Sequence, residues 1–231
     1  MRPLQYVKNG AHDLIARVDR AIEAGEIDEA EWHRQVSVVI TPAYLAGDNP
    51  RSQSGYSRDD VDWTHARGLI ADAIDRSGTF LDIGCASGYL MECMQRWCAA
   101  KGITIEPYGL DIAPELAELA QRRLPHWSDR IWVGNAINWR PPMQFEFVRT
   151  GLYVPRPRRR DLVEHLLQHV VRPGGRLIIG TENEDREPNP EDPTTEQLVL
   201  SWGMRLAGRS ERPHRDPRVC YRVIWVDAKA C

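Results

Sequence analysis

The pattern of apolar and polar positions changes character near residue 78. Before that point, apolar residues recur at helical spacing, which predicts helices over residues 11–45 and 60–75. After it, short apolar runs alternate with amphipathic stretches, which predicts buried strands separated by helices. Strands joined by helices favour a parallel sheet covered on both faces, because each crossover packs its helix against the sheet.

The expected strands share short runs of β-branched, aliphatic or aromatic residues. They cover residues 79–83, 103–110, 131–133, 145–149 and 176–180, with helices at 89–100, 114–124, 161–171 and 195–202. Two strand-like segments at 204–210 and 219–227 are close enough in sequence to form an antiparallel hairpin. The sequence therefore predicts an α/β fold: a doubly wound, mostly parallel seven-stranded sheet with an antiparallel C-terminal hairpin and additional N-terminal helices.

A polar, turn-rich stretch at residues 46–57 indicates a boundary within the chain. We expect residues 1–55 to form a helical appendage or lid, and residues 56–231 to form the main domain. Because the strand pattern begins only near Thr79, the appendage is not needed to build the sheet. We expect it to fold over the carboxyl ends of the strands instead.

The composition narrows the class of protein. The chain has 231 residues, 42% of them hydrophobic, and a net charge of −3, which suits one α/β domain with an appendage. The mild acidity disfavours nucleic acid as a partner. No apolar run approaches the roughly 20 residues that span a bilayer, so no membrane partner is expected. Five cysteines without a C-x-x-C pair favour reduced thiols, no metal site and a cytoplasmic location.

A glycine-rich turn follows the first expected strand, in the segment FLDIGCASGY. Asp82 ends the strand, and Gly84 and Gly88 flank three small residues before a helix. Small residues let a ligand approach the backbone, and a helix N-terminus supplies N–H groups without intrahelical acceptors. A dinucleotide fingerprint starting at Gly84 needs two further glycines where this chain has Ala86 and Tyr89. The acidic strand end suits a ligand with a positive group.

Two more polar positions lie where later strands are expected to end. Asp111 follows the second strand, and a carboxylate there can accept hydrogen bonds from both hydroxyls of a ribose. NAD-binding proteins share this feature, so Asp111 indicates nucleoside binding in general. Asn135 follows the third strand, where it can hydrogen-bond the edge of an adenine while Ala136 donates from its backbone.

The order and spacing of these segments resemble class I S-adenosylmethionine (SAM)-dependent methyltransferases, the Rossmann-like methyltransferase superfamily. LDIGCASG resembles the first motif of that family, D/E-x-G-x-G-x-G, with Ala86 replacing the middle glycine. GLDIAP resembles the second motif, GNA the third, FEFVRTGL the fourth, and RPGGRLII the turn and strand that follow. The resemblance covers roughly residues 56–227 and implies SAM as the cofactor.

The resemblance also implies roles for single residues. Its cofactor-binding set comprises Asp82, Gly84, Cys85, Ala86, Gly88, Asp111, Ile112, Asn135, Ala136 and Arg149. In this set the glycine-rich turn surrounds the methionine part of SAM, Asp111 and Ile112 hold ribose and adenine, and Asn135 and Ala136 hold the adenine. Arg149 and Thr150 face the sulfonium and the acceptor.

No sequence motif identifies a catalytic residue. The candidates are His65, Arg149 and Tyr153. His65 is the most plausible general base, although a surface or core role is favoured for it over catalysis. Methyl transfer is a displacement at an already activated carbon, so alignment of the two reactants supplies much of the catalysis. Tyr56 and Trp63 precede the first strand, where aromatic faces can shield a sulfonium.

No sequence motif identifies the molecule that accepts the methyl group. The fourth motif lacks the Asn/Asp-Pro-Pro-Tyr/Phe signature of enzymes that methylate base amines. Net charge and the absence of an added RNA-binding module favour a small-molecule substrate, for example in secondary metabolism. The alternatives are an RNA or protein methyltransferase and a SAM-binding protein without transferase activity; the residues at 86 and 89 oppose an NAD-dependent oxidoreductase. Formation of a homodimer stays open.

Two charged segments each allow a functional interpretation and a purely structural one. Arg156, Arg158, Arg159 and Arg160 form a basic cluster, for which a solvated loop is favoured over contact with an acidic substrate. The acidic, proline-containing stretch at residues 182–192 is interpreted equally well as a lid or as an exposed connection.

Overall fold

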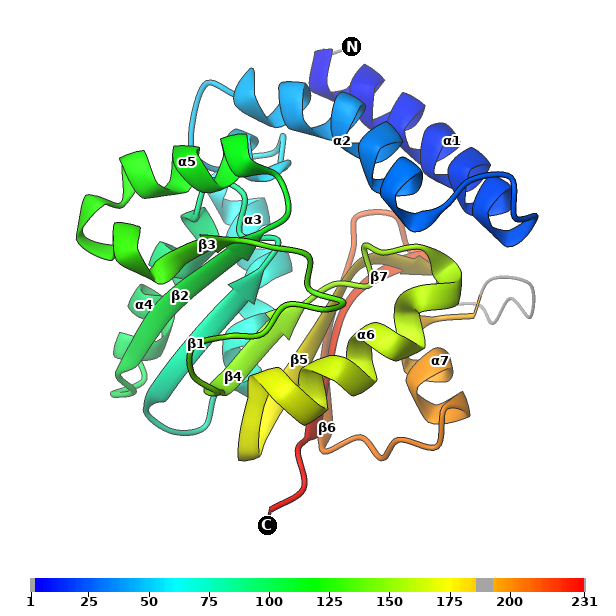
Figure 1. Cartoon of the computed structure of the whole chain (residues 1–231). Helices are drawn as coiled ribbons and strands as arrows, with labels where there is room; N and C mark the ends of the chain where they lie inside the picture. The colour runs from blue at the N-terminus through cyan, green and yellow to red at the C-terminus, as the bar shows by residue number, and fades with distance from the viewer. Residues whose placement is uncertain (1–2, 186–192, 231) are drawn as a thin grey trace.

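The computed structural model describes residues 3–185 and 193–230, so most of the acidic stretch lies outside the described residues. The described strands form one seven-stranded sheet in the order β3-β2-β1-β4-β5-β7-β6 (Figure 1). Their bounds are Gly78–Ile83 (β1), Ile105–Asp111 (β2), Ile131–Val133 (β3), Phe145–Thr150 (β4), Val171–Asp185 (β5), Gly208–Pro213 (β6) and Val219–Asp227 (β7). The first five are parallel, and β7 runs antiparallel to both neighbours, which confirms the predicted sheet and hairpin.

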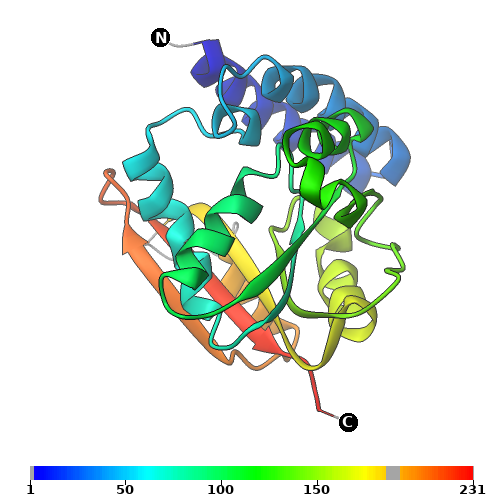
Figure 2. The same cartoon turned by 90° about the vertical axis from the view of Figure 1, so that its left-hand side faces the viewer.

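Two layers of helices cover the sheet (Figure 2). One layer contains α3 (Asp60–Arg67), the 3₁₀ turn η2 (Gly68–Ala73), α4 (Tyr89–Ala99), α5 (Pro114–Arg123) and the 3₁₀ turn η3 (Pro125–Arg130). The other contains α6 (Arg159–His165), the π-turn η5 (Leu166–Val170) and α7 (Thr195–Ser201). Alternate strand residues enter the two cores: Phe80 and Phe147 face the first layer, and Leu81 and Val148 face the second.

The N-terminal helices α1 (Pro3–Glu23) and α2 (Glu29–Leu45) form a pair above the sheet (Figure 1). The Trp32 indole donates to Asp19 Oδ1 at 2.9 Å, which joins the two helices through a buried hydrogen bond. Asp28 caps α2 by accepting from Glu31 N at 2.8 Å. Both helices lie on the side where the parallel strands end, since α2 contacts the loop that follows β3.

Several element bounds differ from the sequence prediction, and β5 is the longest example, covering Val171–Asp185 where residues 176–180 were expected. The helix expected to reach residue 75 changes to a 3₁₀ turn at Gly68, where glycine lowers helix stability. The helix expected at 161–171 ends in a π-turn. The strand expected from residue 204 begins only at Gly208, because Met204 N still donates to the last turn of α7 at Val199 O.

Candidate functional site

The glycine-rich turn between β1 and α4 has the backbone of a ligand-binding loop. Gly84, Ala86 and Gly88 all have positive φ, at 75°, 47° and 74°. A Cβ placed on Gly84 meets nothing within 4 Å, so this part of the backbone faces open space at the end of β1. Ala86 adopts a left-handed conformation that costs an L-residue about 1–2 kcal/mol, as expected where glycine is the ordinary residue.

Asp111 at the end of β2 holds this turn in place. Its two carboxylate oxygens accept from Ala86 N at 2.8 Å and from Ala113 N at 2.9 Å. Burial raises the pKa of Asp111, and the two backbone N–H groups oppose that rise. A carboxylate has about four lone-pair sites, so acceptor capacity is left for the hydroxyls of a ribose.

Apolar and polar groups lie side by side between the end of β2 and the loop that follows β3. Ile112 keeps 40% of its surface exposed beside the carboxylate. Asn135 Oδ1 accepts from Ile137 N at 3.1 Å, and its Nδ2 donates to Glu29 Oε1 of α2 at 3.1 Å. The Ala136 N–H has no acceptor among the described residues. An apolar wall, a carbonyl oxygen and a spare N–H are the groups that an adenine needs.

Asp82 and Arg149 form a buried ion pair across β1 and β4. Arg149 Nη1 donates to Asp82 Oδ1 at 3.2 Å, and the side chains of Arg149 and Asp82 are 6% and 2% exposed. Burial raises the pKa of Asp82 and the arginine opposes the rise. Arg149 Nε is buried without a hydrogen-bond partner among the described residues. The carboxylate expected to meet a positive ligand group is thus already paired with an arginine, which retains a spare donor.

Two predicted cofactor residues turn their side-chain positions into the core. Cys85 is 2% exposed, and burial raises the pKa of its thiol well above the ordinary value. A Cβ on Gly88 would lie 2.6 Å from Leu124 Cδ1. Cys85 and Gly88 can therefore serve a ligand only through their backbone.

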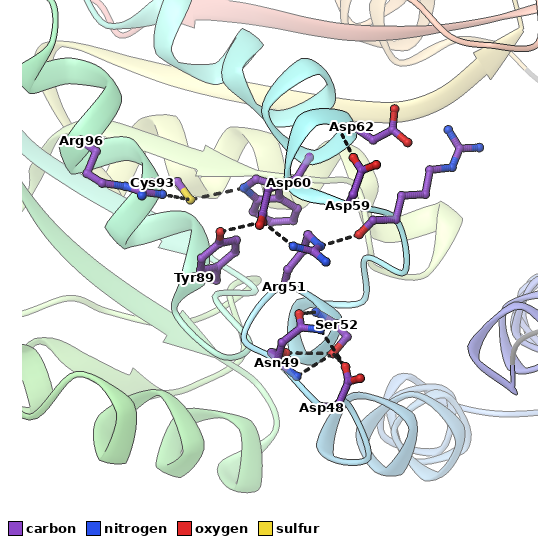
Figure 3. A network of polar contacts seen from close by, with 12 residues as sticks. Asp48, Asn49, Arg51, Ser52, Asp59, Asp60, Asp62, Tyr89, Cys93 and Arg96 are labelled. Carbon is purple, nitrogen blue, oxygen red and sulfur yellow. Dashed lines mark hydrogen bonds and ion pairs between the residues drawn. The ribbon is translucent and has the colours of Figure 1, made fainter.

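The segment between α2 and α3 is fastened to the glycine-rich turn. The Ser87 hydroxyl donates to Pro50 O at 2.7 Å and lies 2.8 Å from Ser54 Oγ. Asp60 accepts from Tyr89 at 3.0 Å and pairs with Arg51, as Figure 3 shows. The sequence did not single out Ser87, although a hydroxyl inside a ligand-binding turn was the available signal.

The basic cluster after β4 is largely exposed, but two of its arginines also pair with acidic residues of the N-terminal helices. Arg156 pairs with Asp19 of α1 at 3.3 Å, and Arg158 donates to Glu29 Oε2 of α2 at 2.9 Å. These arginines attach the N-terminal helices to the main domain. Sequence reasoning missed this because the acidic partners lie more than a hundred residues away along the chain.

The three catalytic candidates have different surroundings in the structure. His65 Nε2 lies 2.9 Å from Pro213 O, which places it against the β6–β7 hairpin. Tyr153 is 63% exposed, whereas Arg149 is buried beside Asp82. The described residues include no cluster of three or more side chains able to hold a metal ion.

The two aromatic residues expected to shield a sulfonium have another partner. Trp63 is 2% exposed, and its indole donates to Cys93 Sγ at 3.3 Å, so it belongs to the core. The Arg67 guanidinium lies 5.8 Å from the Tyr56 ring centroid and 5.2 Å from that of Trp63. The cation over these rings is an arginine of the chain itself.

Comparison with known proteins identifies the fold. No family model and no curated protein matches the sequence. The N-methyltransferase NodS from Bradyrhizobium japonicum, solved with S-adenosyl-L-homocysteine (SAH), matches with a TM-score of 0.59 and 14% identity over 82% of this chain and 96% of its own. A 1,6-didemethyltoxoflavin-N1-methyltransferase from Burkholderia thailandensis, solved with its substrate and SAH, matches at 0.60 and 16% over 88% and 91%. The [4+2]-cyclase SpnF matches at 0.56 and 15% over 71% and 80%.

These likenesses show that the chain has the class I SAM-dependent methyltransferase fold. The identities of 14–16% establish the architecture and not the acceptor. No helix in the described part of the chain is long and apolar enough to cross a membrane.

Proposed function

We propose that this protein transfers the methyl group of SAM to a small-molecule acceptor. The observation that carries the proposal is the open backbone at Gly84, held beside the Asp111 carboxylate at the ends of two adjacent strands. Two proteins of the same fold, NodS and the 1,6-didemethyltoxoflavin-N1-methyltransferase, are methyltransferases solved with SAH. The second of them holds a small-molecule substrate.

The residues at the strand ends fit SAM in one orientation, with its adenine near β3 and its methionine part near β4. Ile112 and Ala136 offer the apolar wall and the spare N–H that suit an adenine, and Asp111 suits the ribose. The methionine part then extends past Gly84 toward Arg149 on β4, since β1 lies between β2 and β4 in the sheet. Arg149 Nε supplies a buried donor on that side.

The chain contributes mainly binding and enclosure. SAM, when bound, supplies a methyl group that its sulfonium already activates. Asp111 and the glycine-rich turn fix the cofactor, while α1, α2 and the segment after them lie over the strand ends and exclude water. We take residues 1–55 to act as this lid, and positioning of the two reactants to provide most of the rate enhancement.

An assay for SAH formation tests the proposal. The protein is incubated with SAM and a panel of small phenols, amines and carboxylic acids, alongside total RNA and protein fractions, and SAH is quantified by mass spectrometry. We expect SAH above the acceptor-free background with at least one small molecule. SAH formation only with RNA or protein would contradict the proposed acceptor class. Binding of SAM without turnover of any acceptor would favour a SAM-binding protein without transferase activity.

A further inference from the structure

Glu29 connects the N-terminal helices to the loop that follows β3. It is the first residue of α2, and its Oε1 accepts from Asn135 Nδ2 at 3.1 Å. Its Oε2 accepts from Arg158 Nε at 2.9 Å, so the carboxylate bridges two segments of the main domain. The Asp28 cap fixes the start of the helix, which leaves Glu29 little freedom to move away.

Both partners of the Asn135 side chain impose the same amide orientation. A carboxylate only accepts hydrogen bonds, so the NH₂ group must face Glu29. The Ile137 N–H only donates, so the carbonyl oxygen must face it, at 3.1 Å. Without Glu29 only the Ile137 N–H still favours this orientation. An amide that reverses at the cost of that bond directs its NH₂ toward a ligand.

The fixed orientation presents a defined pattern to a nucleobase. Asn135 Oδ1 has a second lone pair, and the neighbouring Ala136 N–H has no acceptor among the described residues. One acceptor beside one donor complements adenine, whose edge carries the N6 amino group and the unprotonated N1. Hypoxanthine carries a carbonyl oxygen and an N1–H at these places, which is the opposite pattern.

We propose that Glu29 is a positioning residue through which the N-terminal helices select an adenine-containing cofactor, by holding the Asn135 amide with its oxygen toward the base. This inference rests on the proposed function, because it assumes that the adenine of SAM lies at Asn135. It assigns to α2 a role in recognition of the nucleobase in addition to enclosure of the site.

Calorimetry with two cofactor analogues tests the role of Glu29 without any acceptor. The probes are SAH and its deaminated form, S-inosyl-L-homocysteine, and the readout is the ratio of their dissociation constants. Glu29→Gln is nearly isosteric, but its amide can pair with Asn135 in either orientation. We expect the preference for SAH over the inosyl analogue to fall about tenfold in this variant. Glu31→Gln, two residues further along α2 and paired with Arg34 on the surface, is the control and should keep the preference.

A double variant separates positioning from a structural role. In Glu29→Gln/Asn135→Asp the residue at 135 has only acceptor oxygens, and the new glutamine donates to one of them. Orientation no longer matters there, so the preference for SAH should return to within about threefold of the original ratio.

Two results would overturn the inference. One is an unchanged ratio in Glu29→Gln with an unchanged melting temperature. The other is a lost preference that the double variant does not restore. If the unmodified protein binds neither analogue, the proposed function itself fails, and that outcome is distinct from both.

Discussion

Asp82 and Asp111 stand at the carboxyl ends of neighbouring strands, yet their surroundings give them different tasks. Asp111 accepts two backbone N–H groups and shapes the glycine-rich turn. Asp82 is paired with the Arg149 guanidinium inside the protein. The sequence predicted both as ligand-binding carboxylates, because it shows where a strand ends but not which side chain the next strand places opposite.

Replacing Asp111 by Asn should weaken binding of SAH without unfolding the protein. The amide keeps one acceptor oxygen, sets its NH₂ against one of the two backbone N–H groups that Asp111 accepts, and loses the charge that strengthens hydrogen bonds to ribose hydroxyls. The loss of charge alone is worth roughly 1.5–3 kcal/mol, or about 10- to 150-fold in affinity. Calorimetry measures the affinity and circular dichroism the fold. Asp129→Asn, at an exposed position, is the control. Unchanged affinity in a folded Asp111 variant would remove this residue from the cofactor site.

Replacing Arg149 by Gln should lower the free energy of unfolding by about 3–5 kcal/mol, because Asp82 is left buried without its cation. Arg34→Gln breaks an exposed ion pair with Glu31 and should cost about 1 kcal/mol or less. Urea denaturation measures both. Equal, small losses in the two variants would show that the buried pair contributes no more to the free energy of unfolding than an exposed pair does.

The pH dependence of the stability of Arg149→Gln follows from the direction in which the pKa of Asp82 is shifted. Burial raises the pKa of Asp82 in the folded state, and loss of Arg149 removes the main group that opposes the rise. A folded-state pKa above the unfolded value favours folding at low pH and disfavours it as the pH rises through the folded-state pKa. The stability deficit of Arg149→Gln should therefore shrink as the pH is lowered from 7 toward 5.

At the scale of elements, the segment between α2 and α3 is held against the glycine-rich turn. The turn-rich composition of residues 46–57 predicts a boundary within the chain. In the structure they contain a 3₁₀ turn at Ser52–Ser54 and are held by Ser87 and by the network around Asp60 (Figure 3). Composition indicates a turn but carries no information on the partner that orders it.

Replacing Ser87 by Ala should loosen this segment. The change removes the bond to Pro50 O and the contact with Ser54 Oγ, which together are worth about 1–2 kcal/mol. Limited trypsin digestion at Arg51 measures the loosening, and cleavage there should become several-fold faster. Ser128→Ala, where the hydroxyl also donates to a proline carbonyl but on an exposed turn, is the control. Identical cleavage rates in both variants would mean that Ser87 does not hold the segment.

At the scale of the whole molecule, the mostly parallel sheet and its antiparallel C-terminal hairpin could be predicted from the alternation of strands and helices along the sequence. That alternation allows few arrangements, because crossovers between parallel strands are right-handed and short segments pair locally. The attachment of the N-terminal helices could not be predicted in the same way. It depends on ion pairs such as Arg158 with Glu29, which join residues far apart in sequence.

The central claim is that this fold binds SAM through the turn at Gly84 and the carboxylate of Asp111. Its most direct test is calorimetric titration of the full chain with SAH and, separately, with NAD. The account predicts a micromolar dissociation constant for SAH, about −8 kcal/mol, and no measurable binding of NAD. Binding of NAD together with no binding of SAH would contradict it.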